Sequence, residues 1–101
     1  MTMLEIVKQA LRVTGGAYDG RLTLLISVAV ADLALAGADS SEYATDPLVQ
    51  EAVCTFCAAR FGTVEPEEYD RLKKSYAEQK AQMQMSGKYS LYDKKVQPDG
   101  T

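Results

Sequence analysis

Two cysteines three positions apart, Cys54 and Cys57, come closer to a chemical motif than any other residues in the chain. A CxxC pair is redox-active when it sits at a helix N-terminus after a strand, because the helix dipole there lowers the pKa of the thiol. Here the pair lies inside a predicted helix, and no strand–helix–strand pattern precedes it. Free cysteine is among the most buried residue types, so the sequence favours core filling over thiol chemistry.

The chain contains no histidine, which removes the commonest general base and metal ligand. Serine–histidine and cysteine–histidine nucleophile pairs are therefore absent. A zinc ion on Cys54 and Cys57 would need two further ligands, which only a site shared between subunits could supply. We predict a protein that is not an enzyme, with no catalytic residue, cofactor or metal.

The other charged and glycine-rich segments have structural explanations. Four acidic residues cluster near the start of the last predicted helix, where the macrodipole favours carboxylates: Glu65, Glu67, Glu68 and Asp70. They point in different directions on the helical turn, so we interpret them as a solvated helix start. Gly15 and Gly16 are not followed by the GKS or GKT of a phosphate loop, and they predict a helix stop.

The C-terminal third has a basic lean with tyrosines interleaved, given by Lys73, Lys74, Lys80, Lys88, Lys94 and Lys95. A solvated face is the favoured interpretation, and an acidic protein partner or nucleic acid are the alternatives. The whole chain carries 14 acidic and 11 basic residues, a net charge of -3. Nucleic-acid binders usually present a basic patch or stripe, so this balance argues against DNA binding as the main role.

These residues are positioned by what we predict to be an all-α, four-helix bundle-like fold. The chain of 101 residues fits one domain with a modest core. Thr2 and Glu5 form a capping-box pattern for a first helix that runs to Gly15 and Gly16. The apolar stretch 22–38 is interrupted by Ser27 and is too short to span a bilayer, so we expect no membrane association.

The second helix is apolar on two faces. It begins near Asp19 as the N-cap and ends at Gly37. One face has core spacing, with Leu22, Leu25, Ile26, Ala29 and Leu33, and the opposite face carries Leu24, Val28, Ala31 and Leu35. Such a helix is either the central helix of the bundle or one that packs its second face on a partner.

The third helix is predicted from the Asp46 cap and Pro47 at its first position to a stop at Gly62. The fourth begins around Pro66. Its predicted inward residues are Tyr69, Leu72, Tyr76 and Met83. We expect one helical domain over residues 1–86 and a flexible, extended C-terminal tail over 87–101, because helical periodicity is lost from Ser86 onward.

The order of these features resembles the head-tail connector family of tailed bacteriophages, whose members are also called DNA-packaging or adaptor proteins. The resemblance covers about residues 4–89. It is carried by Lys8 and Leu11, by Asp19 with Leu22, Leu25, Ile26 and Ala29, by Gly37, by Asp46 and Pro47, and by Ser75 and Tyr76. Each marker is common by itself, and the specificity lies in their order and spacing.

The resemblance implies a protomer that forms a homo-oligomeric ring below the portal protein in the virion. The ring would extend the channel for passing double-stranded DNA, without sequence-specific binding, and dock stopper or tail-completion proteins. Assembly would take place in the host cytoplasm. The candidate contacts with a neighbouring subunit or the portal are Leu24, Val28, Leu35, Tyr89, Leu91 and Tyr92. The alternating residues of the tail favour strand addition on a partner.

The alternative function is a small helical DNA-binding regulator or a small terminase subunit. A helix-turn-helix needs a short turn before a basic recognition helix. The third predicted helix contributes only Arg60 as a basic residue, and the loop before it is long. The connector is therefore the favoured interpretation.

Overall fold

The computed structural model describes residues 1–38, 40, 43 and 45–85, and it confirms the all-α prediction. These residues form four helices: α1 (Met3–Leu11), α2 (Asp19–Leu35), α3 (Pro47–Arg60) and α4 (Pro66–Met85). None of the described residues belongs to a β-strand. The predicted boundary at residue 86, together with Tyr89, Leu91, Tyr92 and the proposed tail pairing, lies outside the described residues.

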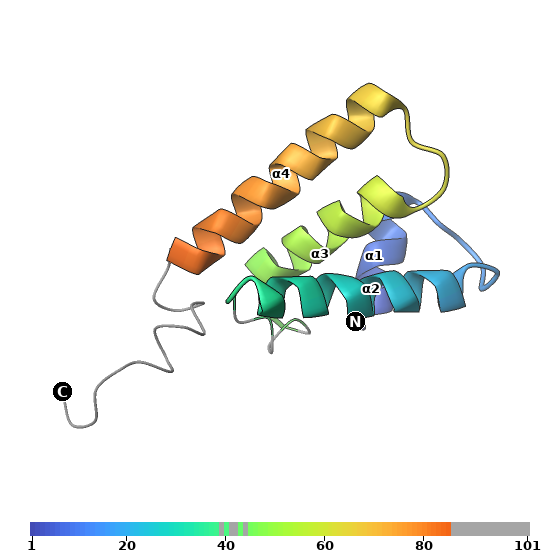
Figure 1. Ribbon diagram of the computed structural model, residues 1–101. Coiled ribbons are helices and arrows are strands. Elements are labelled where there is room, and N and C mark those ends of the chain that lie inside the picture. Colours follow the sequence, from blue (N-terminus) through green and yellow to red (C-terminus); the bar gives the residue numbers. More distant parts are fainter. Residues whose placement is uncertain (39, 41–42, 44, 86–101) are drawn as a thin grey trace.

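The central helix is α3. It packs against α1, α2 and α4, and Figure 1 shows it lying between α2 and α4. Six of its residues are buried: Val49, Ala52, Val53, Thr55, Phe56 and Cys57. Of the two possibilities for the second helix, the central position is thus wrong, because α3 occupies it. The outer face of α2 is left without a covering element in the described part of the chain.

Local signals set the start of α1, and packing sets its end. Thr2 and Glu5 form the predicted capping box, in which the Thr2 hydroxyl accepts from the Glu5 N–H at 3.1 Å. The predicted stop at the two glycines is wrong, because the helix ends at Leu11. Arg12 adopts the left-handed conformation (φ 59°), and the Val13 N–H donates to the Lys8 carbonyl at 2.9 Å. This early stop turns Val13 onto the core.

The start of α2 differs from the prediction by one position. Asp19 is the first helical residue, Tyr18 occupies the N-cap, and no side chain caps the helix. The Asp19 carboxylate instead pairs with Lys8 of α1 at 2.9 Å. Lys8 also donates to the Gly15 carbonyl, so one ammonium group ties α1 to the connection that follows it.

The remaining helix ends follow the sequence signals. Gly37 has φ of 85° and closes α2, while the Ala38 N–H donates to the Leu33 carbonyl at 2.9 Å. The Asp46 carboxylate accepts from the Leu48 N–H at 2.9 Å, with Pro47 at the first position of α3. Of the predicted inward residues of α4, Tyr76 and Met83 are buried, and Tyr69 and Leu72 are half-buried.

Candidate functional site

The outer face of α2 carries three of the eight large apolar side chains that are exposed among the described residues. Leu24, Val28 and Leu35 expose 55%, 43% and 88% of their surface, and Ala31 between them is also exposed. Their spacing of four, three and four residues places them on one stripe of the helix. The inner stripe of the same helix is buried, as predicted, with Leu22, Leu25, Ile26, Ala29 and Leu33 in the core.

A shallow hollow runs beside this stripe. It has a volume of about 300 Å³ and is lined by Ile26, Ser27, Val30, Ala31, Ala34 and Tyr43. The hydroxyl of Ser40 donates to the Val30 carbonyl at 3.0 Å, which fastens the segment after α2 to the edge of the hollow. We define the α2 outer face as Leu24, Val28, Ala31 and Leu35. This face forms a ridge of side chains beside a groove, and helices pack by placing the ridges of one into the grooves of another.

A polar contact joins α2 to α4 at a separation of 44 residues. The Tyr76 hydroxyl donates to Asp32 Oδ2 at 2.6 Å, and Lys80 Nζ donates to the same oxygen at 3.2 Å. The Tyr76 ring also meets Phe56 edge-on, with ring centroids 5.2 Å apart. This contact orients α4 on α3 and α2, and it was not predicted because no local sequence pattern links residues so far apart.

The pKa values of Asp32 and Tyr76 in this contact are shifted in opposite directions. Partial burial by itself would raise the pKa of Asp32, but hydrogen bonds from Tyr76 and Lys80 outweigh it and hold the pKa below its usual range. Burial, followed by the neighbouring Asp32 carboxylate, raises the pKa of Tyr76 above its usual range. A charged Asp32 and a neutral Tyr76 are therefore the stable forms around neutral pH.

Removing the Tyr76 hydroxyl tests this contact. Tyr76→Phe is expected to lower the free energy of unfolding by about 1 kcal/mol at pH 7, because one charge-assisted hydrogen bond is lost from a half-exposed carboxylate. The deficit relative to wild type should shrink as the pH falls below 4. A carboxyl with a lowered folded pKa stabilises above its unfolded pKa and loses that effect on protonation.

Urea unfolding followed by circular dichroism at pH 3 and pH 7 measures this difference. Tyr69→Phe is the matched control on α4, since Tyr69 makes no side-chain hydrogen bond within the described structure. Equal effects of the two substitutions at pH 7 would show that the bond to Asp32 contributes nothing.

The two cysteines lie in the interior of α3, away from its N-terminus. Cys57 is fully buried and Cys54 is half-buried, and both are free thiols. Burial raises the pKa of Cys54 to about 11 and that of Cys57 to about 12. Because the thiolate is the reactive form, this placement supports the core-filling interpretation over the redox one.

Alkylation tests the inertness of the thiols. At pH 7.5, iodoacetamide should modify Cys57 at least about 100-fold more slowly in the native protein than in urea, since burial and the raised pKa both disfavour the thiolate. Mass spectrometry of the labelled peptides gives both rates. Assembly should be the same with and without reductant, and native labelling as fast as in urea would contradict the assignment.

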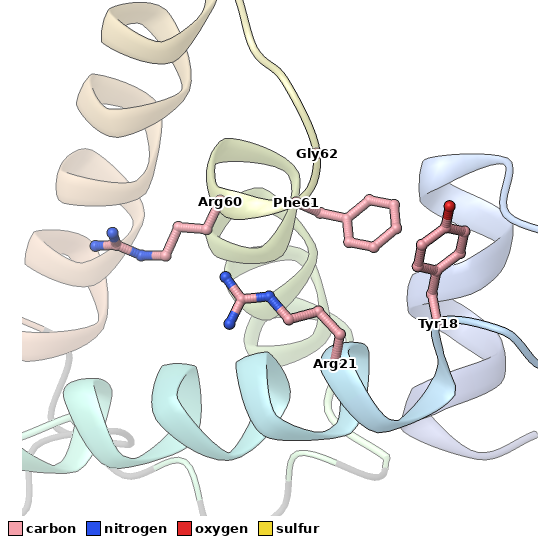
Figure 2. A pocket seen from close by; sticks show the side chains of 5 residues that line it. All are labelled: Tyr18, Arg21, Arg60, Phe61 and Gly62. Carbon is pink, nitrogen blue, oxygen red and sulfur yellow. The ribbon is translucent and has the colours of Figure 1, made fainter.

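A second hollow lies where α2 begins and α3 ends. It has a volume of about 380 Å³ and is lined by Tyr18, Arg21, Arg60, Phe61 and Gly62. Figure 2 shows the Tyr18 and Phe61 rings beside each other, Arg21 reaching from α2 toward α3, and Arg60 directed away from the two rings. Tyr18 and Phe61 meet edge-on with centroids 5.3 Å apart. Sequence reasoning did not find this hollow, because its arginines are 39 positions apart in the chain.

The described part of the chain does not bring together three or more cysteines and carboxylates in a group that could hold a metal ion. No helix among those residues is long and apolar enough to cross a bilayer. The acidic residues predicted as a helix start lie there: Glu67 and Glu68 are in the first turn of α4, and Glu68 pairs with Arg71.

A family model described as phage connector protein matches residues 3–90 of the chain. The match includes all four helices of the structure. Comparisons with curated proteins and with solved structures gave no match.

Proposed function

Because the chain belongs to the phage connector protein family, we propose that it is the head-tail connector of a tailed bacteriophage and forms a homo-oligomeric ring below the portal. The family is one of structural proteins, in keeping with the prediction of a non-enzymatic role. The ring extends the DNA channel in the virion and gives stopper or tail-completion proteins a surface to dock on. Assembly takes place in the host cytoplasm.

The observation that carries the ring proposal is the exposed α2 outer face. A large exposed apolar patch on a small domain marks a site of association. In a closed ring each subunit uses two different surfaces, one toward each neighbour. The α2 outer face, with Leu24, Val28 and Leu35, supplies one of them together with the adjoining hollow at Tyr43.

The net charge of -3 is consistent with a channel component. A strongly basic wall would bind phosphates by releasing counterions and would hold the DNA in place. An acidic subunit contributes little such binding, so double-stranded DNA passes without being retained. We propose that the tail, with Tyr89, Leu91 and Tyr92, contributes a contact to the portal or the adjacent subunit.

The regulator alternative is disfavoured by the connection between α2 and α3. Eleven residues separate Leu35 from Pro47, where a helix-turn-helix has a turn of about three or four. A mobility-shift assay at low salt separates the two functions. The connector should give no sequence-dependent shift, and a discrete shifted band on a specific site would favour the regulator.

A phage in which this gene is interrupted tests the function itself. We expect filled or leaking heads and free tails to accumulate separately, and expression of the wild-type chain to restore joined particles. Electron microscopy of the lysate reports both. Normal joined virions in the absence of the chain would contradict the proposal.

A further inference from the structure

The pocket at the start of α2 and the end of α3 is lined by two arginines, and neither forms an ion pair with a carboxylate of the described residues. We define the arginine pocket as Tyr18, Arg21, Arg60, Phe61 and Gly62. The ion pairs of the described residues join Lys8 to Asp19, Arg71 to Glu68 and Lys80 to Asp32, and none involves Arg21 or Arg60. Arg60 instead lies over the Phe56 ring, 4.3 Å from its centroid.

This arrangement suits a carboxylate-bearing side chain. Guanidinium groups hold carboxylates in planar, bidentate hydrogen bonds, so Arg21 and Arg60 can each receive one such group. The edge-on pair of Tyr18 and Phe61 lies beside Arg21 and adds apolar surface, as Figure 2 shows. An occupant therefore has a carboxylate at its tip and methylene groups behind it, which describes glutamate and aspartate on a helix.

DNA phosphate is a poorer occupant. A duplex backbone is a continuous polyanion and is recognised by an extended basic surface. Asp19 follows Tyr18 directly in the chain, and Asp32 lies close enough to Arg60 for the guanidinium to lower its pKa. The positive charge of the pocket is thus local, and it fits a short acidic segment better than a strand of DNA.

The chain carries a segment of this kind at the first turns of α4. Glu65 just before the helix and Glu67 and Asp70 within it are exposed, and none of them forms an ion pair within the described structure. The segment begins three residues after Gly62, yet it forms no ion pair with Arg60 of its own chain. Its carboxylates are therefore available to another copy.

Ring geometry is compatible with this pairing. Rotation about the ring axis preserves height, so two surfaces that meet between neighbours must lie at the same level of the subunit. The start of α2 and the end of α3, whose residues line the arginine pocket, lie at the same end of the molecule as the start of α4 (Figure 1). The charges are also of opposite sign.

We propose that the arginine pocket receives the acidic first turns of α4, with Glu67 and Asp70, from a neighbouring copy of this chain. The inference rests on the proposed ring and adds to it a polar contact that fixes the orientation of neighbours. The α2 outer face contributes apolar area, and the arginine pocket selects which side of the neighbour it meets.

A charge swap tests the proposal in the full chain. Arg21→Glu/Arg60→Glu and Glu67→Lys/Asp70→Lys should each weaken ring assembly at least about tenfold, by placing like charges opposite each other. The variant with all four changes should assemble within about threefold of wild type. Arg12→Glu, a reversal at the exposed end of α1, is the control and should assemble normally. Native mass spectrometry over a concentration series gives the ring fraction.

Cross-linking tests the contact without requiring a closed ring. In Arg21→Lys/Arg60→Lys, a carbodiimide should join position 21 or 60 of one copy to position 67 or 70 of another. Mixing ¹⁴N- and ¹⁵N-labelled chains identifies bonds between copies. If these bonds form and no ring is found, the proposed function fails and the contact stands. The inference is overturned if wild type forms rings but no cross-links form between copies. It is also overturned if the variant with all four charge reversals does not regain assembly.

One further outcome concerns DNA. Rings of Arg21→Glu/Arg60→Glu that assemble like wild type but lose a weak low-salt mobility shift seen with wild type would assign the pocket to phosphate. That result would overturn the proposal of a second copy as the occupant.

Discussion

Val28→Asp is expected to abolish ring assembly while leaving the subunit folded. Val28 lies at the middle of the α2 outer face and is 43% exposed in the subunit, so aspartate is solvated there and costs little. In the ring the same carboxylate would be buried against an apolar neighbour, which is strongly unfavourable without a partner. We expect association to weaken at least about 100-fold, equivalent to about 2.7 kcal/mol per contact.

Sedimentation velocity measures association, and circular dichroism checks that the helices remain. The matched control is Gln82→Asp, which adds the same carboxylate at an exposed position inside α4. Equal loss of assembly in both variants would mean that added charge, and not the α2 outer face, is responsible. Wild-type assembly of Val28→Asp would remove this face from the interface.

Leu33→Ala is expected to lower the free energy of unfolding by about 3 kcal/mol, the usual cost of truncating a fully buried leucine. Leu33 is fully buried, whereas Leu35, two positions later on the same helix, is 88% exposed. Leu35→Ala should therefore change stability by less than about 0.5 kcal/mol while weakening assembly.

Urea unfolding and sedimentation velocity, applied to both variants, separate the two faces of α2. We expect Leu33→Ala to lower stability and Leu35→Ala to weaken association. A loss of stability of similar size in both would show that the outer face is covered within the subunit. Such a result would contradict the assignment of one buried and one exposed apolar face to α2.

Much of the fold could be predicted because its signals are local. The Thr2–Glu5 capping box, the Asp46–Pro47 start and the Gly37 stop each depend on residues within a few positions. The two faces of α2 followed from spacing alone. What spacing could not decide was whether the second face met another helix of the subunit, since that depends on where α3 and α4 pack.

The errors and omissions have a common cause in tertiary contacts. Arg12 ends α1 in a conformation better suited to glycine, and Val13 after it packs against the core. Asp19 pairs with Lys8 and does not cap its helix. The bond from Tyr76 to Asp32 likewise depends on helices that meet only in the folded chain.

Some of the candidate contact residues could be chosen from the sequence and others could not. Leu24, Val28 and Leu35 could be chosen from periodicity, and their exposure in the subunit supports their use as a contact surface. Arg21 and Arg60 could not be paired from sequence, because only the packing of α2 on α3 brings them to one pocket. Tyr89, Leu91 and Tyr92 stay predictions, since they lie beyond residue 85.

Native mass spectrometry of the full chain, alone and with its cognate portal, tests the central claim most directly. We expect a discrete high-order ring, or stoichiometric loading of the chain onto the portal, and the loss of both in Val28→Asp. A monomer or simple dimer that does not bind the portal would contradict the proposal that this chain is a ring-forming head-tail connector.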